Sequence, residues 1–227
     1  NVDFFTKKWT IVSQSSNNNF LSTNYVLWRN DEYKKYIIAF PGTRDKIVEI
    51  FGEIFLIGLV GYNDEEDEIK VPSYFKDAAF DLKDLVFSNK NLNDINEHPG
   101  YQFIAVGHSL GGAVATIILY EGVSKGYIDP NKNEPVLITF GQPRTGNEEF
   151  VIDFNKKIKN IFRVVRDGDL VVDLPPQTLI GNKYCHLGGL ILVNKDANSM
   201  ISCPKEIGED YPDKECQKSF SIDLKYH

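Results

Sequence analysis

Runs of apolar residues divide the middle of the chain into alternating strands and helices. Short β-rich runs bounded by polar turns predict strands, and apolar residues at three- and four-residue spacing predict amphipathic helices. The predicted strands are residues 25–28, 36–40, 102–106, 136–140, 161–165 and 189–193. The predicted helices are residues 73–87, 113–120 and 148–158.

The order of these elements indicates an α/β fold. A polar turn separates the first two strands, which predicts a hairpin, whereas strand and helix alternate between residues 102 and 165. Such alternation is typical of a mainly parallel sheet with helices on both faces. No linker composition interrupts the chain, so we expect residues 1–227 to form a single domain.

Length and charge exclude some classes of function. A chain of 227 residues, 42% of them hydrophobic, can bury a substantial core without metals or dense disulfides. The formal net charge is −7, and Lys and Arg do not cluster as a phosphate-binding surface requires, so we expect no nucleic-acid partner. The longest apolar run, residues 54–60, is far shorter than the roughly 20 residues that cross a bilayer. We therefore expect no transmembrane segment.

The cysteines and the first residue favour a secreted protein. Cys203 and Cys216 flank a turn-rich acidic stretch in which a short disulfide is geometrically easy, and Cys185 is left over. Asn1 stands where an unprocessed chain would have Met, which suits a chain whose signal peptide has been removed. We therefore expect a secreted chain with a disulfide between Cys203 and Cys216.

One short motif carries the candidate chemistry. Residues 107–111 read GHSLG and match the pattern G-x-S-x-G, after a predicted strand and before a predicted helix. In α/β-hydrolases a serine at this place stands on a tight turn, and the flanking glycines let strand and helix approach closely. We therefore expect Ser109 to be a nucleophile. The backbone N–H of Leu110, at the start of the helix, is expected to stabilise an oxyanion.

A serine nucleophile needs a base that takes its proton and an acid that orients the base. In an α/β-hydrolase both follow the serine in the sequence. Among the four histidines, this order leaves His186 and His227. The strand 161–165 leads into a turn with three candidate acids, and the pattern alone does not select among Asp167, Asp169 and Asp173.

Several separate segments resemble the motifs of one family, the class 3 lipases (the fungal triacylglycerol lipases). They are residues 98–101 (HPGY), 107–113 (GHSLGGA), 140–147 (FGQPRTGN) and 168–176 (GDLVVDLPP). Because these motifs fall in the family's order, the resemblance covers most of the chain from about Tyr36 onward. It implies the α/β-hydrolase fold and activity on carboxylic esters of lipids.

The resemblance also implies roles for single residues. Residues 168–176 are similar to the family's N-D-x-V-x-x-L-P-P, which makes Asp169 the triad acid. Residues 184–188 (YCHLG) resemble a Y-x-H-x-G segment whose histidine is structural in the family. The region from Cys203 to Cys216 resembles the paired-cysteine loop that precedes the family's catalytic histidine. This implies His227 as the base, with His186 kept as the alternative.

Residues 40–44 (FPGTR) are similar to the family's F-R-G-[ST]-x, with Pro41 in place of Arg. The resemblance implies that Thr43 is the second oxyanion donor, beside Leu110. A plain turn containing Pro-Gly would satisfy the same residues.

Residues 45–55 form an amphipathic helical pattern. One face is apolar, and charged residues lie opposite; the apolar residues are Ile47, Ile50, Phe51 and Ile54. Such a stripe is often only a helix packed on its core. In class 3 lipases, however, the segment directly after the oxyanion loop is a short helical lid. The resemblance thus implies a lid that covers the site in water and opens at an oil surface.

Together these features predict a secreted serine ester hydrolase, foremost a triacylglycerol lipase, that forms an acyl-enzyme on Ser109 without metal or cofactor. Its expected partner is a lipid or ester substrate at an oil–water interface, and we expect a monomer. A soluble carboxylesterase, such as a feruloyl esterase, and a phospholipase are alternatives on the same scaffold. A catalytically impaired lipid-binding protein is the alternative of another class, which only Pro41 and Tyr226 favour.

Overall fold

The computed structural model describes residues 8–16, 24–42, 58–64 and 67–203. Its strands are β1 (Thr10–Ser16), β2 (Asn24–Asn30), β3 (Lys35–Phe40), β4 (Leu59–Gly61), β5 (Lys70–Pro72), β6 (Gln102–His108), β7 (Val136–Phe140), β8 (Asn160–Arg166), β9 (Thr178–Leu179), β10 (Asn182–Lys183), β11 (Leu190–Val193) and β12 (Met200–Ser202). Its helices are α2 (Ser73–Val86), α3 (Asn89–Glu97), α4 (Leu110–Ser124), α5 (Pro130–Asn133), α6 (Glu148–Lys157) and the 3-10 turn Val171–Asp173.

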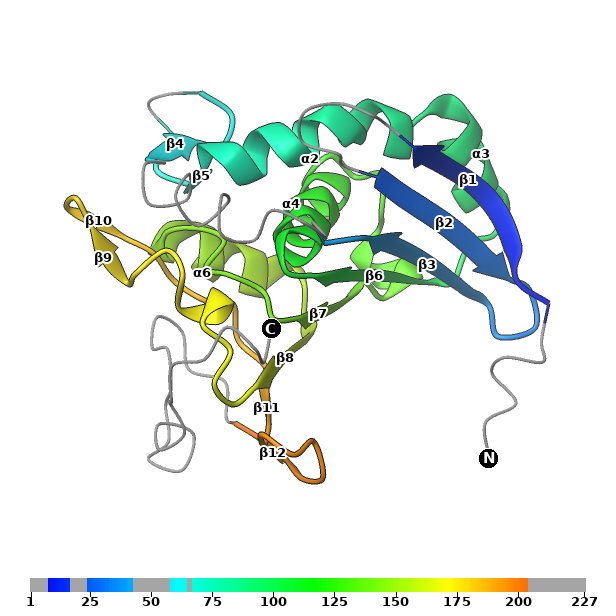
Figure 1. Ribbon diagram of the computed structural model, residues 1–227. Coiled ribbons are helices and arrows are strands. Elements are labelled where there is room, and N and C mark those ends of the chain that lie inside the picture. The colour runs from blue at the N-terminus through cyan, green and yellow to red at the C-terminus, as the bar shows by residue number, and fades with distance from the viewer. Residues whose placement is uncertain (1–7, 17–23, 43–57, 65–66, 204–227) are drawn as a thin grey trace.

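A mainly parallel sheet, flanked by helices, forms the centre of the molecule (Figure 1). Its strand order is β1-β2-β3-β6-β7-β8-β11-β12. The five strands from β3 to β11 in this order pair in parallel, and β1, β2 and β12 pair antiparallel at the two sides. The predicted α/β-hydrolase fold class is therefore confirmed. In such a sheet the carboxyl ends of the parallel strands meet at one edge, where ligands bind.

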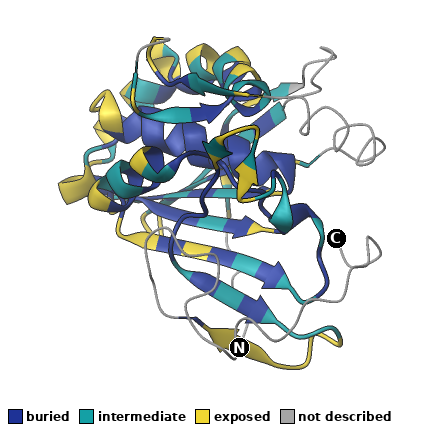
Figure 2. Ribbon diagram, turned by 90° about the vertical axis from the view of Figure 1, so that its left-hand side faces the viewer, coloured by how far each residue is buried: buried dark blue, intermediate teal, exposed yellow. Residues whose placement is uncertain are grey.

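The most buried helix lies directly on the sheet. Every residue of α4 from Leu110 to Val123 is buried, because the helix packs against β3, β6 and β7 and is covered by α2. Figure 2 shows buried residues concentrated in the helix next to the sheet and exposed residues on the outer helices. Along β3 and β6 buried residues alternate with half-buried ones, as a strand with one fully covered face requires.

The hydrophobic pattern predicts six of these strands and three of these helices correctly. The expected hairpin is β2–β3, and the expected strands and helices from residue 73 to residue 193 correspond to α2, β6, α4, β7, α6, β8 and β11. The pattern does not predict α3, whose Asn-rich sequence favours turns and whose only buried residues are Asn91 and Ile95. The single-domain prediction for residues 1–227 stays a prediction.

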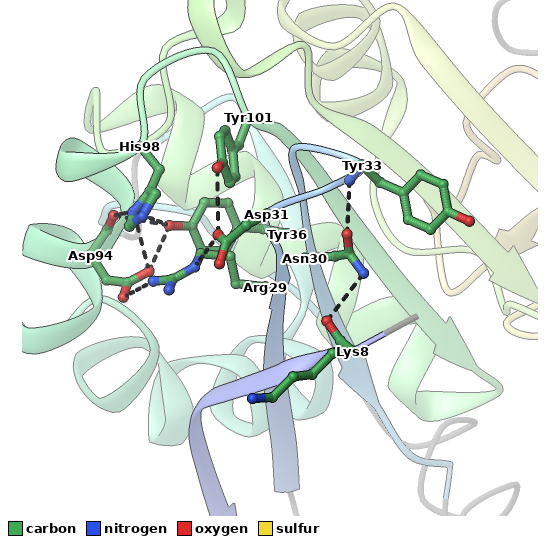
Figure 3. Close-up of polar contacts among 9 residues, drawn as sticks. All are labelled: Lys8, Arg29, Asn30, Asp31, Tyr33, Tyr36, Asp94, His98 and Tyr101. Atoms are coloured by element: carbon green, nitrogen blue, oxygen red, sulfur yellow. Dashed lines mark hydrogen bonds and ion pairs between the residues drawn. The ribbon is translucent and has the colours of Figure 1, made fainter. Parts of the chain in front are cut away.

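A polar cluster secures α3 at the edge of the sheet where β3 and β6 begin (Figure 3). Asp94 of α3 accepts hydrogen bonds from Arg29 of β2 at 2.5 Å and from the Tyr36 hydroxyl of β3 at 2.6 Å. His98, which follows α3, lies with its Nδ1 atom 3.2 Å from the same hydroxyl and 2.7 Å from the Asp94 carbonyl oxygen. These contacts explain why a helix with little apolar surface packs at this place.

We expect Asp94→Ala to lower the free energy of unfolding by about 2 kcal/mol, because the Tyr36 hydroxyl and the Arg29 guanidinium lose their hydrogen bonds to the Asp94 carboxylate. Urea denaturation followed by circular dichroism measures this change. Asp81→Ala, an exposed position on α2, is the control and should change stability by less than about 0.5 kcal/mol. Equal effects in the two variants would show that the cluster does not stabilise the fold.

Candidate active site

Ser109 lies at the sharp turn between β6 and α4. Its φ is 53° and its ψ is −126°, a combination that L-residues rarely adopt. The turn is fixed on both sides: the Ser109 N–H donates to the Phe140 carbonyl oxygen of β7 at 2.9 Å, and the Ser109 carbonyl accepts from the Gly112 N–H at 2.9 Å. Such a strained serine at the carboxyl end of a central strand is the geometry of a nucleophile elbow.

Two glycines allow the close packing of this turn. A Cβ atom on Gly107 would lie 2.1 Å from the Gly111 carbonyl oxygen, and one on Gly111 would lie 2.3 Å from the Phe40 carbonyl oxygen. Both distances are far below van der Waals contact, so neither position accepts a larger residue without movement of backbone. The two glycines of the motif are thus explained by contacts of the strand with the helix, and of the helix with the end of β3.

The loop after β3 reaches Ser109. A Cβ atom on Gly42 would lie 2.9 Å from the His108 carbonyl oxygen and 3.3 Å from the Cβ of Ser109. Leu110 is the first residue of α4, where backbone N–H groups have no partner within the helix. Thr43, the expected second oxyanion donor, follows Gly42 directly but lies outside the described residues.

The structure distinguishes two of the three candidate acids that follow β8, Asp169 and Asp173. Asp169 is only 2% exposed, and its Oδ1 accepts a hydrogen bond from the Val171 N–H at 2.9 Å. Asp173 instead faces the guanidinium of Arg144, with Oδ1 at 3.6 Å from Nη2. β8 lies two strands from β6 in the sheet, and Asp169 follows the carboxyl end of β8 as Ser109 follows that of β6, so both residues lie at the same edge of the sheet.

Arg144 is a site residue whose role the sequence motif did not disclose. It is 4% exposed and extends from the loop after β7 to the loop that carries Asp169. Its Nη1 donates to the carbonyl oxygens of Asp173 and Pro175, the latter at 2.7 Å, and its backbone N–H donates to the Leu174 carbonyl at 2.7 Å. In the sequence, only its place in the segment 140–147 (FGQPRTGN) indicates that Arg144 belongs near the site.

His186 is also buried, against the loop that carries Asp169. Its Nε2 lies 2.8 Å from the Val172 carbonyl oxygen, which only accepts, so Nε2 carries the proton. Burial lowers the pKa of His186 well below its ordinary value of 6.5, and the charges of Arg163 and Arg144 lower it further, against the effect of the bond to Val172. A neutral imidazole with Nε2 bound to backbone supports the loop and does not present that atom to a serine.

This environment makes the stability depend on pH. Above pH 6.5 the imidazole is neutral in both the folded and the unfolded chain. Below pH 6.5 the unfolded chain binds a proton that the folded chain does not, so the free energy of unfolding falls as the pH falls. His186→Gln keeps a donor for Val172 and does not titrate.

We therefore expect the wild-type protein to lose about 1 kcal/mol more per pH unit than His186→Gln below about pH 6. Urea denaturation at several pH values between 5 and 8 measures the difference. Parallel curves for the two proteins would contradict the assigned environment of His186.

Several expected site residues lie outside the described part of the chain. They are Thr43, the lid residues Ile47, Ile50, Phe51 and Ile54, Cys216 and His227.

Cys185 is buried and forms no disulfide, and Cys203 is buried in a small cluster with Val165, Val172, Leu190 and Leu192. Cys203 is disulfide-bonded; its expected partner, Cys216, lies outside the described residues, so this pairing stays a prediction. None of the described helices has the length and apolar character needed to cross a bilayer. Within the described residues, no group of acidic residues, histidines and cysteines could hold a metal ion.

Comparison with known proteins identifies the family. A family model described as lipase (class 3) matches residues 37–179, more than half of the chain. The chain belongs to the class 3 lipases. The match contains the turn with Ser109 and Leu110, the segment with Arg144 and the loop with Asp169, so the elements that form the candidate site lie within the family's own region.

Curated class 3 lipase relatives are similar over part of their length. The secreted mono- and diacylglycerol lipase 1 of Fusarium solani is 33% identical over 102 residues, which cover 45% of this chain and 27% of that protein. A phospholipase A1-II 1 of Oryza sativa is 39% identical over 88 residues, which cover 38% of this chain and 22% of that protein. The chain thus spans about a quarter of the length of these relatives.

Solved structures support the fold. The lipase of Rhizomucor miehei in complex with its propeptide superposes with a TM-score of 0.80 at 22% identity, over 97% of this chain and 68% of that chain. At this identity the similarity establishes the class 3 lipase fold and not the reaction.

Proposed function

We propose that this protein is a serine carboxylic ester hydrolase, foremost a triacylglycerol lipase, with Ser109 as its nucleophile. The backbone of Ser109 carries the proposal: a residue at φ 53° between a central strand and a buried helix, with backbone held on both sides. A position so unfavourable for the fold alone is retained where it exposes a reactive hydroxyl. Membership in the class 3 lipases supports the same assignment.

In the proposed reaction the Ser109 hydroxyl oxygen attacks the ester carbonyl carbon, while His227 takes the hydroxyl proton. Asp169 accepts a hydrogen bond from the imidazole and fixes its tautomer. The backbone N–H of Leu110 and Thr43 stabilise the oxyanion. The alcohol leaves with the proton from His227, and water then hydrolyses the acyl-enzyme by the same steps. No step requires a metal or cofactor.

The names of the relatives support a lipid substrate and secretion. One curated relative is a secreted mono- and diacylglycerol lipase, so we propose that this chain is secreted and acts on acylglycerols. A phospholipase is the second candidate, because a rice phospholipase A1 has the higher identity over its shorter match. A soluble ester substrate and a defective lipid-binding protein are the remaining alternatives.

A fluorophosphonate probe tests the nucleophile and the base together. We expect the probe to label Ser109, as located by mass spectrometry of the digested protein. Labelling should be lost in His227→Ala and kept in His186→Gln. The opposite result would assign the base to His186, and failure of the native protein to react would favour the lipid-binding alternative.

Hydrolysis of a long-chain p-nitrophenyl ester and of phosphatidylcholine tests the substrate. A rate that rises when the p-nitrophenyl ester exceeds its solubility supports a lipase, and activity confined to a soluble short-chain ester supports an esterase. Faster release of fatty acid from phosphatidylcholine than from triacylglycerol would support the phospholipase.

A further inference from the structure

The hairpin β9–β10 exposes a large apolar side chain at its tip. Ile180 is 85% exposed, the highest value among the exposed large hydrophobic residues of the described chain. Its φ is 49°, in the left-handed region, and the next residue, Gly181, has φ 76°. A β-branched residue is strongly disfavoured at positive φ, where Asn, Asp or Gly is usual. Isoleucine is therefore unfavourable at this turn for two reasons: it rarely adopts this backbone conformation, and its apolar side chain is exposed to water.

The rest of the hairpin is firmly attached to the fold. Leu179 pairs with Asn182, and the Tyr184 N–H donates to the Gln177 carbonyl oxygen at 2.8 Å. Lys183 forms an ion pair with Glu148 of α6 at 2.9 Å. Further along, Cys185 forms a β-bridge with Gly146. These contacts fix the direction of the tip, so Ile180 does not gain burial by folding back onto the protein.

The hairpin projects at the functional edge of the molecule. It is the continuation of the loop that carries Asp169, and it is followed by the segment with His186. Figure 1 shows it extending beyond the edge at which β3 and β6 end, the edge that also carries Ser109. An apolar residue at this tip would meet whatever surface the active site faces.

We propose that Ile180 is an anchor that inserts into a neutral lipid surface and holds the active-site edge against it. This inference rests on the proposed function, which supplies the lipid substrate. A single projecting side chain suits a fluid lipid phase, which surrounds an inserted group on all sides. A specific protein partner would require a contact area of more than about 1,000 Å², which a hairpin tip does not offer.

The charges near the tip favour a neutral rather than an anionic surface. The neighbours of the turn, Thr178 and Asn182, are uncharged. Lys183 is the cation closest to Ile180 in the sequence, and its charge is offset by Glu148. The whole chain carries a net charge of −7, which an anionic surface would repel. The tip therefore depends on apolar insertion alone.

The test compares Ile180→Asn with Ile11→Asn, both in a Ser109→Ala background. Ile11 is 54% exposed on β1, at the other side of the sheet, and provides the same chemical change away from the site. Sedimentation with phosphatidylcholine vesicles measures the partition coefficient. We expect about a tenfold decrease for Ile180→Asn and less than a twofold change for Ile11→Asn. Ile180→Gly should agree with Ile180→Asn, because both residues accept positive φ.

Thermal denaturation of the same variants checks the fold, and the melting temperature of Ile180→Asn should equal or exceed that of the parent. In the active enzyme, Ile180→Asn should leave the rate of hydrolysis of a soluble short-chain ester within twofold of the native rate and slow hydrolysis of emulsified lipid about tenfold.

An unchanged partition coefficient, or equal losses for Ile180→Asn and Ile11→Asn, would overturn the proposal. The partition coefficient is measured without turnover. Absence of esterase activity in the active enzyme would therefore refute the proposed function, while the partition coefficients would still test whether Ile180 binds lipid.

Discussion

Ser109→Ala is expected to reduce kcat for a soluble p-nitrophenyl ester by about 10⁴- to 10⁶-fold, the largest effect of any single substitution in this chain. The reason is chemical: alanine has no hydroxyl, so no acyl-enzyme forms and only oxyanion stabilisation and binding remain. Alanine keeps the Cβ atom, so the backbone conformation at φ 53° is as strained as before. Initial rates with active-site titration of the native enzyme measure the loss.

A matched control distinguishes loss of the reactive hydroxyl from loss of a serine at a helix N-terminus. Ser109 and Ser88 are both N-cap residues, of α4 and α3 respectively, and neither side chain makes a capping hydrogen bond. Ser88→Ala should therefore leave kcat and the melting temperature unchanged. Residual activity above about 1% in Ser109→Ala, in protein freed of native enzyme, would show that another group is the nucleophile.

The sharp turn at Ser109 could be predicted from the sequence because most of its geometry is local. Gly107 is required by the contact of its strand with the helix that directly follows, whereas Gly111 is required by the contact of that helix with the end of β3. Alternation of apolar residues places β6 before the turn, and the apolar helix α4 follows it. Apart from the contact of Gly111 with β3, these features belong to β6, the turn and α4, which follow one another directly in the sequence, so a short pattern carries them.

The helix α3 shows what a hydrophobic pattern does not contain. It is held by Asp94, whose partners Arg29 and Tyr36 lie on strands far earlier in the sequence. Its sequence is rich in Asn, which has low helix propensity. The stability of this helix thus comes from a polar cluster that only the folded chain brings together.

The acid could not be selected by pattern alone, because Asp167, Asp169 and Asp173 all follow β8 in one turn. The structure distinguishes them through residues distant in sequence: Arg144 faces Asp173, and His186 binds the Val172 carbonyl oxygen in the same loop. Together these contacts fix the loop so that Asp169 is buried at the edge of the sheet that carries Ser109.

Asp169→Asn is expected to reduce kcat about 10⁴-fold with little change in fold. The Asn Oδ1 atom still accepts the hydrogen bond from the Val171 N–H, which is 2.9 Å from the carboxylate in the native protein. What is lost is the negative charge that fixes the tautomer of the base and stabilises its protonated form. Kinetics with a soluble ester measure the loss, and urea denaturation should give a free energy of unfolding within about 1 kcal/mol of the native value.

Asp173→Asn and Asp167→Asn are the matched substitutions in the same turn. Arg144 binds the backbone carbonyl of residue 173 as well as its carboxylate, so Asp173→Asn leaves the main attachment of the loop intact and should change kcat less than tenfold. A loss of 10⁴-fold in Asp173→Asn with activity retained in Asp169→Asn would move the acid to the residue beside Arg144. Since the three variants differ only in which carboxylate becomes an amide, their ranking identifies the group that acts on the base, independently of the substrate.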